Sequence, residues 1–484
     1  MIDARTAIGS RFVLVHDDRG GLSGYAVEYE RPLRDSALFT GLSGHGIAEA
    51  ATDGIYVSAD AGSELRCTGT ASYVTTTDQG WKIDETGSWQ QVPVEAVDAA
   101  KRNTDAGWAE WSLRGPRVKP DRQAAVDLWW WVLGFNTMRL RSRPGLLAVV
   151  PSKLGYVGAW QWDSYFIARG LRHPDPALAR DQLLLVTDVQ GRDGLLPDFV
   201  YDDGVLATSA GLPAVEAARL AESPWRSHDR PTVVPLTKPP LLAWAVDALD
   251  DLAPDQDFRA EMLSRSRANH DWWFRVSSSG GVPYYLHPYS SGLDDSPTFD
   301  VGPAHPTADL LAYLADGEAR LAGTPFAGDP ARRVWLAEAL HACQPTETVI
   351  DLLGLHRGLL PRSTVHRLAG RLRDPHDFGG RTAIPTVSRT HPSFDSAHMW
   401  RGPVWVNTNV LVSEGLRSSG RGDLAHAIER ATLDLVQDAG PWEYFDADSG
   451  RPASGAVSHF SWSAALALDL AVREAADGAD QRAD

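Results

Sequence analysis

Residues 283–300 hold the densest group of side chains that could do chemistry. The segment reads PYYLHPYSSGLDDSPTFD, with Asp294, Asp295 and Asp300 set beside three tyrosines and His287. Its Tyr, Ser, Gly and Pro content predicts irregular backbone rather than helix. An acid held among aromatic rings loses solvation, which raises its pKa and suits it to act as a general acid. The alternative is a turn in which Asp294 or Asp295 forms a hydrogen bond with the nearby backbone. When this segment is considered by itself, turn statistics favour the turn.

A second acid is also flanked by aromatic residues. Glu443 stands between Trp442 and Tyr444, on a different segment from Asp294. Two acids on separate aromatic loops are what glycoside hydrolysis requires, because one protonates the leaving oxygen and the other activates water or attacks the sugar carbon. The presence of this second acid favours a catalytic interpretation of Asp294.

Two further segments place a polar group where it could hold a ligand. Residues 158–166, GAWQWDSYF, set Asp163 beside two indole rings. Aromatic faces stack on the CH face of a sugar while a carboxylate accepts from its hydroxyls; the alternative is an Asp that caps the following helix. Lys238, in the segment TKPP at 237–240, could reach a bound hydroxyl or carboxylate, or form a surface ion pair.

Residues 399–405, MWRGPVW, combine a basic group with aromatic rings. Arg401 can hold both oxygens of a carboxylate, while Trp400 and Trp405 could wall a pocket. A structural salt bridge is the alternative for Arg401. Tryptophan is abundant throughout, with 18 residues, and its flat face often stacks on a ligand in a cleft.

Composition excludes several classes of partner. The net charge of −17 argues against nucleic acid and anionic membranes, since both repel an acidic surface. Two cysteines cannot build a dense disulfide scaffold, and so low a count fits a reducing compartment. The N-terminus lacks the apolar segment of a signal peptide, and no apolar run is long enough to cross a bilayer. We therefore expect a cytoplasmic protein that binds neither nucleic acid nor membrane.

The pattern of apolar residues divides the chain in two. Over residues 1–104, short β-type runs punctuated by Gly and Asp predict a small N-terminal antiparallel domain of the β-sandwich type. Over residues 105–484, apolar residues recur at helical spacing and predict a mainly α domain. The β-type runs are 11–16, 24–29, 54–58, 71–77 and 90–95. The helical runs are 123–139, 177–189, 238–252, 257–274, 307–322, 330–342, 363–372, 405–418, 424–438 and 461–476.

Long aromatic loops rich in Pro and Gly separate many of these helices. They lie at roughly 155–166, 191–238, 276–306, 374–404 and 440–461. Long ordered loops usually carry function. Helical hairpins arranged in a ring would bring these loops together on one face, around one cavity.

Taken in order, these motifs resemble those of glycoside hydrolase family 63 and its clan, which includes the trehalases. The resemblance covers about residues 105–475 and depends on the order and spacing of the motifs. They are WQWDS at 160–164, TKP at 237–239, HDWW at 270–273, SGLDDSP at 291–297, WRGPVW at 400–405, EY at 443–444 and FSWSAA at 460–465. It implies an (α/α)6 barrel, preceded by the small β domain, with the active site where the long loops meet.

The resemblance also implies roles for individual residues. It makes Asp294 the general acid and Glu443 the general base, and gives Asp163 the task of holding sugar hydroxyls. Trp400 and Arg401 would lie in the loop that lines the sugar subsite. Because the family inverts anomeric configuration, we expect about 6.5–9.5 Å between the two catalytic carboxyls. The candidate substrate-binding residues are Trp160, Trp162, Asp163, Phe166, Lys238, Tyr289, Gly292, Trp400, Arg401, Trp405, Tyr444, His459 and Trp462.

The activity implied is that of an inverting, exo-acting hydrolase of an α-glucosidic or related α-glycosidic bond. Its substrate would be a small α-glycoside or oligosaccharide, and it would need no metal or organic cofactor. Three alternatives remain open at this point: a rhamnosidase-like or glucoamylase-like barrel hydrolase, a non-catalytic sugar-binding protein, and a lyase of the same barrel type. A lyase acting on anionic uronates would need a basic groove, which the acidic composition disfavours.

Overall fold

The structure, a computed structural model of the 484-residue chain, divides into two units by its internal contacts. The first unit comprises Met1–Gly115 and Leu133–Leu140, and the second comprises Pro116–Val132 and Arg141–Asp484. The residues that the structure describes are 7–8, 10–16, 22–27, 46–51, 54–59, 64–66, 73–75, 79–83, 88–201, 204–206, 236–275, 278–279, 282–285, 287–300, 305–306, 308–324, 347–355, 360–380 and 383–480.

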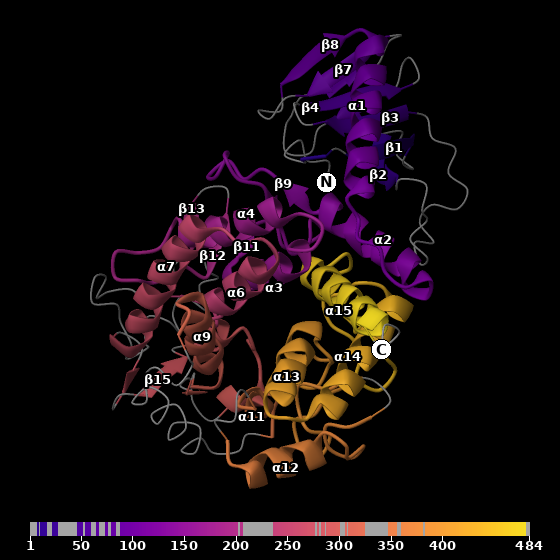
Figure 1. The fold of residues 1–484 in the computed structure, drawn as a ribbon. Coiled ribbons are helices and arrows are strands. Elements are labelled where there is room, and N and C mark those ends of the chain that lie inside the picture. The colour runs from indigo at the N-terminus through magenta and orange to yellow at the C-terminus, as the bar shows by residue number, and fades with distance from the viewer. Residues whose placement is uncertain are drawn as a thin grey trace. The chain divides into compact units, whose positions relative to one another are not determined.

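The first unit is an antiparallel sheet with a helix packed against it (Figure 1). Its strands are β1 (Ser10–His16), β2 (Leu22–Val27), β3 (Gly46–Ala51), β4 (Gly54–Ala59), β5 (Glu64–Arg66), β6 (Tyr73–Thr75), β7 (Gly80–Ile83) and β8 (Trp89–Val92). Among the described residues, six strands pair in the order β2-β1-β3-β4-β7-β8, and β5 pairs with β6 separately. Helix α1 (Val94–Leu113) contacts β3, β4 and β7. The antiparallel β content agrees with the sequence analysis, and the sandwich type expected for this domain stays a prediction.

Helix α1 is an element that the sequence analysis missed. Its buried residues are Val97, Ala100, Thr104, Trp108 and Trp111. Their spacing of three or four positions is that of one helix face, so the helical period was present in the sequence. Polar and glycine residues between these positions obscured it. The domain boundary expected between residues 104 and 105 falls inside this helix, and its position stays a prediction.

The second unit is an (α/α)6 barrel, as the sequence analysis expects (Figure 1). Its inner helices are α3 (Gln161–Leu171), α6 (Leu242–Leu252), α9 (Ala308–Leu321), the short α11 (Ile350–Leu353), α13 (Val406–Ser418) and α15 (Ser461–Asp480). Each of these contacts the next, and α15 returns to α3, which closes the ring. Among the outer helices, α4 (Pro176–Thr187) packs on α3, α7 (Gln256–Arg275) on α6 and α9, and α14 (Gly422–Ala439) on α13 and α15.

Small residues close the ring where α15 meets α3. The middle of α15, from Ala464 to Leu468, is completely buried. A Cβ atom added to Gly170 of α3 would lie 2.3 Å from the carbonyl oxygen of Ala465. Only glycine allows the two backbones to approach so closely, and this contact joins the first inner helix of the barrel to the last.

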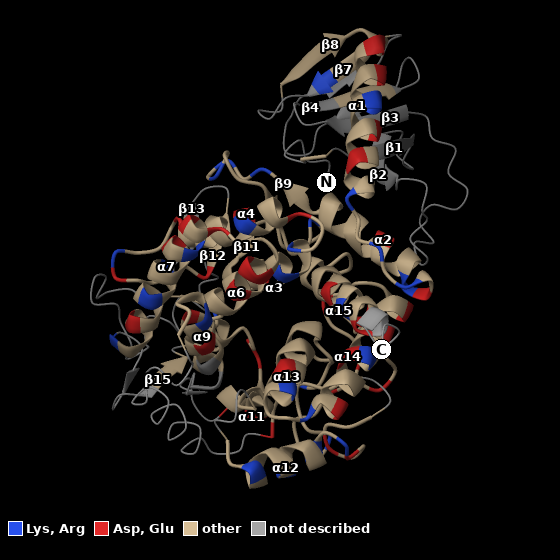
Figure 2. Cartoon of the chain, viewed as in Figure 1, with Lys and Arg blue, Asp and Glu red and all other residues tan. Residues whose placement is uncertain are grey.

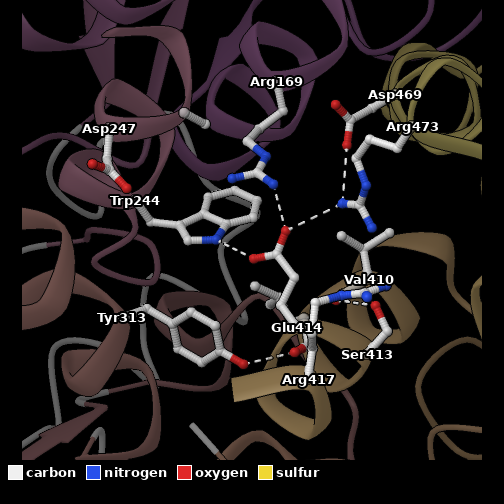
Figure 3. Close-up of polar contacts among 12 residues, drawn as sticks. Arg169, Trp244, Asp247, Tyr313, Val410, Ser413, Glu414, Arg417, Asp469 and Arg473 are labelled. Atoms are coloured by element: carbon white, nitrogen blue, oxygen red, sulfur yellow. Dashed lines mark hydrogen bonds and ion pairs between the residues drawn. The ribbon is translucent and has the colours of Figure 1, made fainter. Parts of the chain in front are cut away.

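A buried ionic network ties the inner helices together (Figure 3). Glu414 of α13 pairs with Arg169 of α3, accepts the indole N–H of Trp244 of α6 at 2.6 Å, and lies 3.7 Å from Arg473 of α15. Asp469, one turn before Arg473 on α15, pairs with it at 3.4 Å. Breaking a buried pair leaves an uncompensated charge and costs about 3–5 kcal/mol, so this network holds four inner helices in register.

The remaining elements of the described chain are short or peripheral. They are α2 (Pro120–Phe135), β9 (Thr137–Met138), β10 (Ala148–Val149), β11 (Ala159–Trp160), β12 (Phe199–Tyr201), β13 (Gly204–Leu206), β14 (Ser278–Ser279), β15 (Val282–Tyr285), α8 (Pro288–Ser291), a 3₁₀ turn (Pro297–Phe299), β16 (His305–Pro306) and α12 (Arg362–Arg371).

Most predicted helices begin and end within a few residues of the observed ones. The run at 238–252 forms helix only from Leu242, and Lys238, which precedes the helix, lines the pocket described below. The helix predicted at 330–342 lies outside the described residues.

Acidic and basic residues are interspersed along the described helices (Figure 2). Within the described part of the chain, no helix combines the length and apolar content needed to cross a bilayer.

Candidate active site

A pocket in the second unit collects most of the residues predicted for the site. Those that line it are Asp294, Glu443, Trp160, Trp162, Asp163, Lys238, Gly292, Trp400, Trp405 and Trp462. They come from six stretches of the chain, and each lies at or before the N-terminal end of an inner helix or on a long loop. The barrel therefore brings together residues that are far apart in the sequence.

The segment that carries Asp294 is held against the pocket wall by a glycine. Gly292 ends α8 in the left-handed region, with φ of 70°. A Cβ atom at this position would lie 2.3 Å from the indole of Trp162. Glycine is therefore required both for the backbone conformation and for the contact. Two residues later, Asp294 faces the pocket.

Lys238 supplies a buried positive charge beside Asp294. Its Nζ lies 3.9 Å from Oδ1 of Asp294 and 3.4 Å from Oδ1 of Asp198, and it donates to the carbonyl oxygen of Tyr289 at 2.5 Å. Burial alone would lower the pKa of Lys238, but attraction from the surrounding carboxylates, Asp198 foremost, raises it overall. The Gln161 side chain accepts the Lys238 backbone N–H at 2.8 Å, which fixes the lysine at the end of its segment.

The structure adds a cation to the setting expected for Asp294. The sequence predicts an apolar environment that keeps this acid protonated. Aromatic rings line the same pocket, but the Asp294 side chain is 34% exposed and its Oδ1 lies 3.9 Å from the Lys238 ammonium group. The protonated state expected for this acid stays a prediction.

Glu443 has the buried environment that was expected for Asp294. It is only 5% exposed, and burial is the main cause that raises its pKa to about 7. The backbone N–H of Val457 donates to its Oε2 at 3.2 Å, and the hydroxyl of Tyr156 is a further hydrogen-bond partner; both lower the pKa, while nearby Asp294 raises it. A carboxylate with a pKa near neutrality is well suited to take a proton from water.

Asp163 lies in the first turn of α3 and is almost fully buried. Burial raises its pKa well above the usual range, against the opposing attraction of Lys238. A carboxyl group that keeps its proton can both donate to and accept from sugar hydroxyls. Its position on the pocket wall is the one expected for a group that holds the sugar.

Stacked aromatic rings form another wall of the pocket. Trp400 stacks on Trp405 with centroids 3.6 Å apart, and Trp405 stacks in turn on Tyr444 at 4.7 Å. Trp162 meets Trp462 edge to face at 5.5 Å. Such surfaces offer a flat face to the CH side of a sugar ring.

Two predicted residues lie behind this wall instead of lining the pocket. Phe166 is completely buried and packs edge to face on Trp162 and Trp462 at 5.6 and 6.0 Å. Tyr444 supports Trp405 from behind. Both hold pocket residues in place rather than face a ligand.

Three more predicted residues have other partners. Arg401 forms a two-armed ion pair with Asp300, at 2.6 and 3.0 Å, so the salt-bridge alternative describes it in this structure. Tyr289 offers its carbonyl oxygen to Lys238. Burial lowers the pKa of His459 to about 4, which keeps its ring neutral.

The pocket also contains residues that the sequence analysis did not select: Tyr156, Met399 and Phe460. Met399 and Phe460 begin the motifs at 399–405 and 460–465, but neither was chosen as a candidate because only the aromatic, acidic and basic residues that follow them were singled out. Tyr156 lies in a loop already marked as long and aromatic, but nothing local distinguishes its hydroxyl from that of any other tyrosine.

A helical barrel with two acids and an indole wall in one pocket is the arrangement expected of a glycoside hydrolase. The family model for the mannosylglycerate hydrolase MGH1-like glycoside hydrolase domain matches residues 156–343 and 329–463. These residues make up more than half of the chain, so the chain belongs to this family, within glycoside hydrolase family 63.

Individual relatives agree with this assignment. Mannosylglycerate hydrolase MGH1 of Selaginella moellendorffii is 27% identical over 413 residues, covering 66% of this chain and 81% of that relative. Mannosylglycerate hydrolase of Rubrobacter radiotolerans is 28% identical over 451 residues, covering 74% and 98%. The solved structure of the Thermus thermophilus enzyme, a GH63 mannosylglycerate hydrolase in complex with glucose, is 26% identical with a TM-score of 0.56 and covers 72% of this chain and 99% of that chain.

Proposed function

We propose that this chain is an inverting, exo-acting hydrolase of a small α-glycoside, and that glycerate is the leaving group. The observation that carries the proposal is that Asp294 and Glu443 line one pocket although they lie on separate loops. The relatives named mannosylglycerate hydrolase support the glycerate leaving group. Membership of family 63 argues against the rhamnosidase-like, glucoamylase-like, lyase and non-catalytic alternatives.

In the proposed reaction, Asp294 gives its proton to the glycosidic oxygen as the bond from that oxygen to the sugar carbon breaks. A water on the opposite face attacks the same carbon, and Glu443 takes a proton from it. The pKa of about 7 for Glu443 leaves a useful fraction ionised at neutral pH. A separation of about 6.5–9.5 Å between the two carboxyls would leave room for that water.

The anionic leaving group itself helps to protonate Asp294. In the free pocket, the Lys238 ammonium lies 3.9 Å from Oδ1 of Asp294. A bound glycerate carboxylate beside this acid introduces a like charge and displaces water, and both effects raise the proton affinity of Asp294. Substrate binding thus converts Asp294 into the acid that the reaction needs.

Hydrolysis of defined glycosides tests the proposal. The purified protein is incubated with α-mannosylglycerate, α-glucosylglycerate, maltose and trehalose, and proton NMR follows the anomer released first. We expect rapid release from a glycerate glycoside, with the β-anomer first. No release from either glycerate glycoside would refute the leaving group, and initial release of the α-anomer would refute inversion.

Two isosteric variants test the catalytic pair. Asp294→Asn and Glu443→Gln should each lower kcat by about 10²–10⁴-fold, the usual contribution of a general acid or base. Asp423→Asn is the matched control, because Asp423 is a surface acid, 63% exposed, that pairs with Arg373. Near-normal turnover by both site variants would contradict the assignment.

A further inference from the structure

One loop, residues 395–405, contacts both of the segments that carry the proposed catalytic acids. The loop is compact in itself. The indole N–H of Trp405 donates to the carbonyl oxygen of Met399 at 2.8 Å, across its width. A Cβ atom on Gly402 would lie 2.3 Å from the carbonyl oxygen of Asp395, so the two arms of the loop are in direct contact. A loop closed in this way transmits a displacement from one side to the other.

On one side, the loop is bound to the segment of the proposed acid. Asp295, the residue after that acid, accepts the backbone N–H of Trp400 through Oδ1 at 2.9 Å. Its Oδ2 lies 3.1 Å from Nε2 of His398. Further along the same segment, Asp300 holds the Arg401 guanidinium group with both oxygens. Two carboxylates thus clamp the two segments together.

On its other side, the loop is bound to the segment of the proposed base. Val404 and Phe445 exchange two backbone hydrogen bonds, at 2.8 and 3.0 Å, and Phe445 follows that base by two residues. The hydroxyl of Ser396 donates to Asp446 at 2.8 Å, and the backbone N–H of Ala447 donates to the carbonyl oxygen of Ser396 at 2.9 Å.

We propose that loop 395–405 is the spacer that sets the distance between the carboxyls of Asp294 and Glu443, and that Asp295 positions Asp294 without touching the sugar. The inference rests on the proposed function. Consecutive Cα atoms are about 3.8 Å apart, so anchoring residue 295 leaves the preceding residue little freedom. Asp295 does not line the pocket, so its effect reaches the substrate only through the residues it holds, Asp294 along the chain and Trp400 through its hydrogen bond. A displacement of about 1 Å at a reacting group can cost about a hundredfold in rate.

The leaving group separates this role from a general structural one. A glycerate alkoxide is a poor leaving group and needs the proton of Asp294 as the bond breaks. Fluoride leaves as a stable anion when the carbon–fluorine bond breaks, so it depends little on that proton. Water attacks the sugar carbon in both cases, and Glu443 takes its proton in both. A misplaced acid therefore slows only the glycerate substrate, whereas a misplaced base slows both substrates.

The experiment compares the glycerate glycoside and the α-glycosyl fluoride of the same sugar in wild type and variants. Asp295→Ala should lower kcat for the glycerate glycoside about a hundredfold with little change in KM, and lower kcat for the fluoride only a few-fold. Asp295→Asn should fall between, because its amide oxygen can still accept the Trp400 N–H. Ser396→Ala, on the base side of the loop, should slow both substrates by the same factor.

Two further variants keep the test decisive. Asp423→Ala removes a surface ion pair with Arg373 and should change neither substrate. His398→Ala removes the side-chain contact with Oδ2 of Asp295, and because the His398 side chain is 60% exposed it should leave folding intact. If Asp295→Ala does not fold, His398→Ala and Asp295→Asn must show the same dependence on leaving group, more weakly.

The outcomes distinguish the inference from the proposed function. Equal losses on both substrates in the Asp295 variants, or no loss on either, overturn the positioning role. A Ser396→Ala variant that hydrolyses the fluoride at the wild-type rate overturns the spacer. A wild-type protein that cleaves neither substrate overturns the proposed function itself.

Discussion

Replacing Tyr156 by phenylalanine should move the acidic limb of the pH–rate profile to higher pH. The proposed base, Glu443, can take a proton only when it is ionised, so we expect activity to fall as the pH drops through its pKa of about 7. The Tyr156 hydroxyl donates a hydrogen bond that stabilises the ionised form and lowers this pKa. Without that hydroxyl, the pKa rises, and a higher pH is needed to ionise the base.

The size of the shift follows from the burial of the site. A hydrogen bond to a charged group contributes about 1.5–3 kcal/mol, and one pKa unit corresponds to about 1.36 kcal/mol. Glu443 keeps the Val457 N–H in the variant and is 5% exposed, so some water can replace the lost hydroxyl. The lower end of the range therefore applies, and we expect a shift of about one unit.

The assay is kcat/KM against pH, which reports groups of the free enzyme. Tyr444→Phe is the matched control, because the Tyr444 hydroxyl donates to the carbonyl oxygen of Ser454 rather than to Glu443. Tyr444→Phe should not shift the acidic limb of the pH–rate profile. An unchanged limb in Tyr156→Phe, a shift to lower pH, or the same shift in the control would refute the reasoning.

Two other substitutions follow from the packing. Gly292→Ala should lower both Tm and kcat, since an alanine with φ near 70° is strained by about 1–2 kcal/mol and its Cβ would strike Trp162; unchanged kinetics would contradict the placement of this segment. Asp469→Asn should destabilise the fold by about 3–5 kcal/mol in denaturant unfolding, because Arg172 loses its buried anion and Arg473 loses one of its three carboxylate partners. The neighbouring basic groups lower the pKa of Asp469. The ionised Asp469 therefore stabilises the fold fully above the unfolded pKa of about 3.9, and this contribution decreases at lower pH. A difference in unfolding free energy between wild type and Asp469→Asn that grew as the pH fell would refute this.

Much of the fold was accessible from local sequence patterns. Apolar residues at helical spacing predicted nearly all of the described barrel helices to within a few residues, because a helix face is encoded by near neighbours. Helix α1 (Val94–Leu113) was not predicted, because polar residues stand between the residues of its buried face and make the helical period less evident. The closed ring was expected only through the resemblance to a known family, not from periodicity.

The candidate site was predictable in its residue types but not in its electrostatics. The motifs identified Asp294 and Glu443 as acids on aromatic loops, but they did not indicate that burial raises the pKa of Glu443 or that Lys238 lies beside Asp294. Arg401 had two interpretations, and its pairing with Asp300 decides between them in this structure. The hydroxyl of Tyr156 reaches Glu443 only because their loops meet in space.

The sequence by itself determined which segments are helical, which loops carry acids and indoles, and the family to which their order belongs. Tertiary structure decided which charges face each other and which acid is desolvated. The reason is physical: helical periodicity depends on residues three or four positions apart, whereas a pKa depends on burial and on charges within a few ångströms, whatever their distance along the chain. Lys238 and Asp294 are neighbours only because the barrel closes.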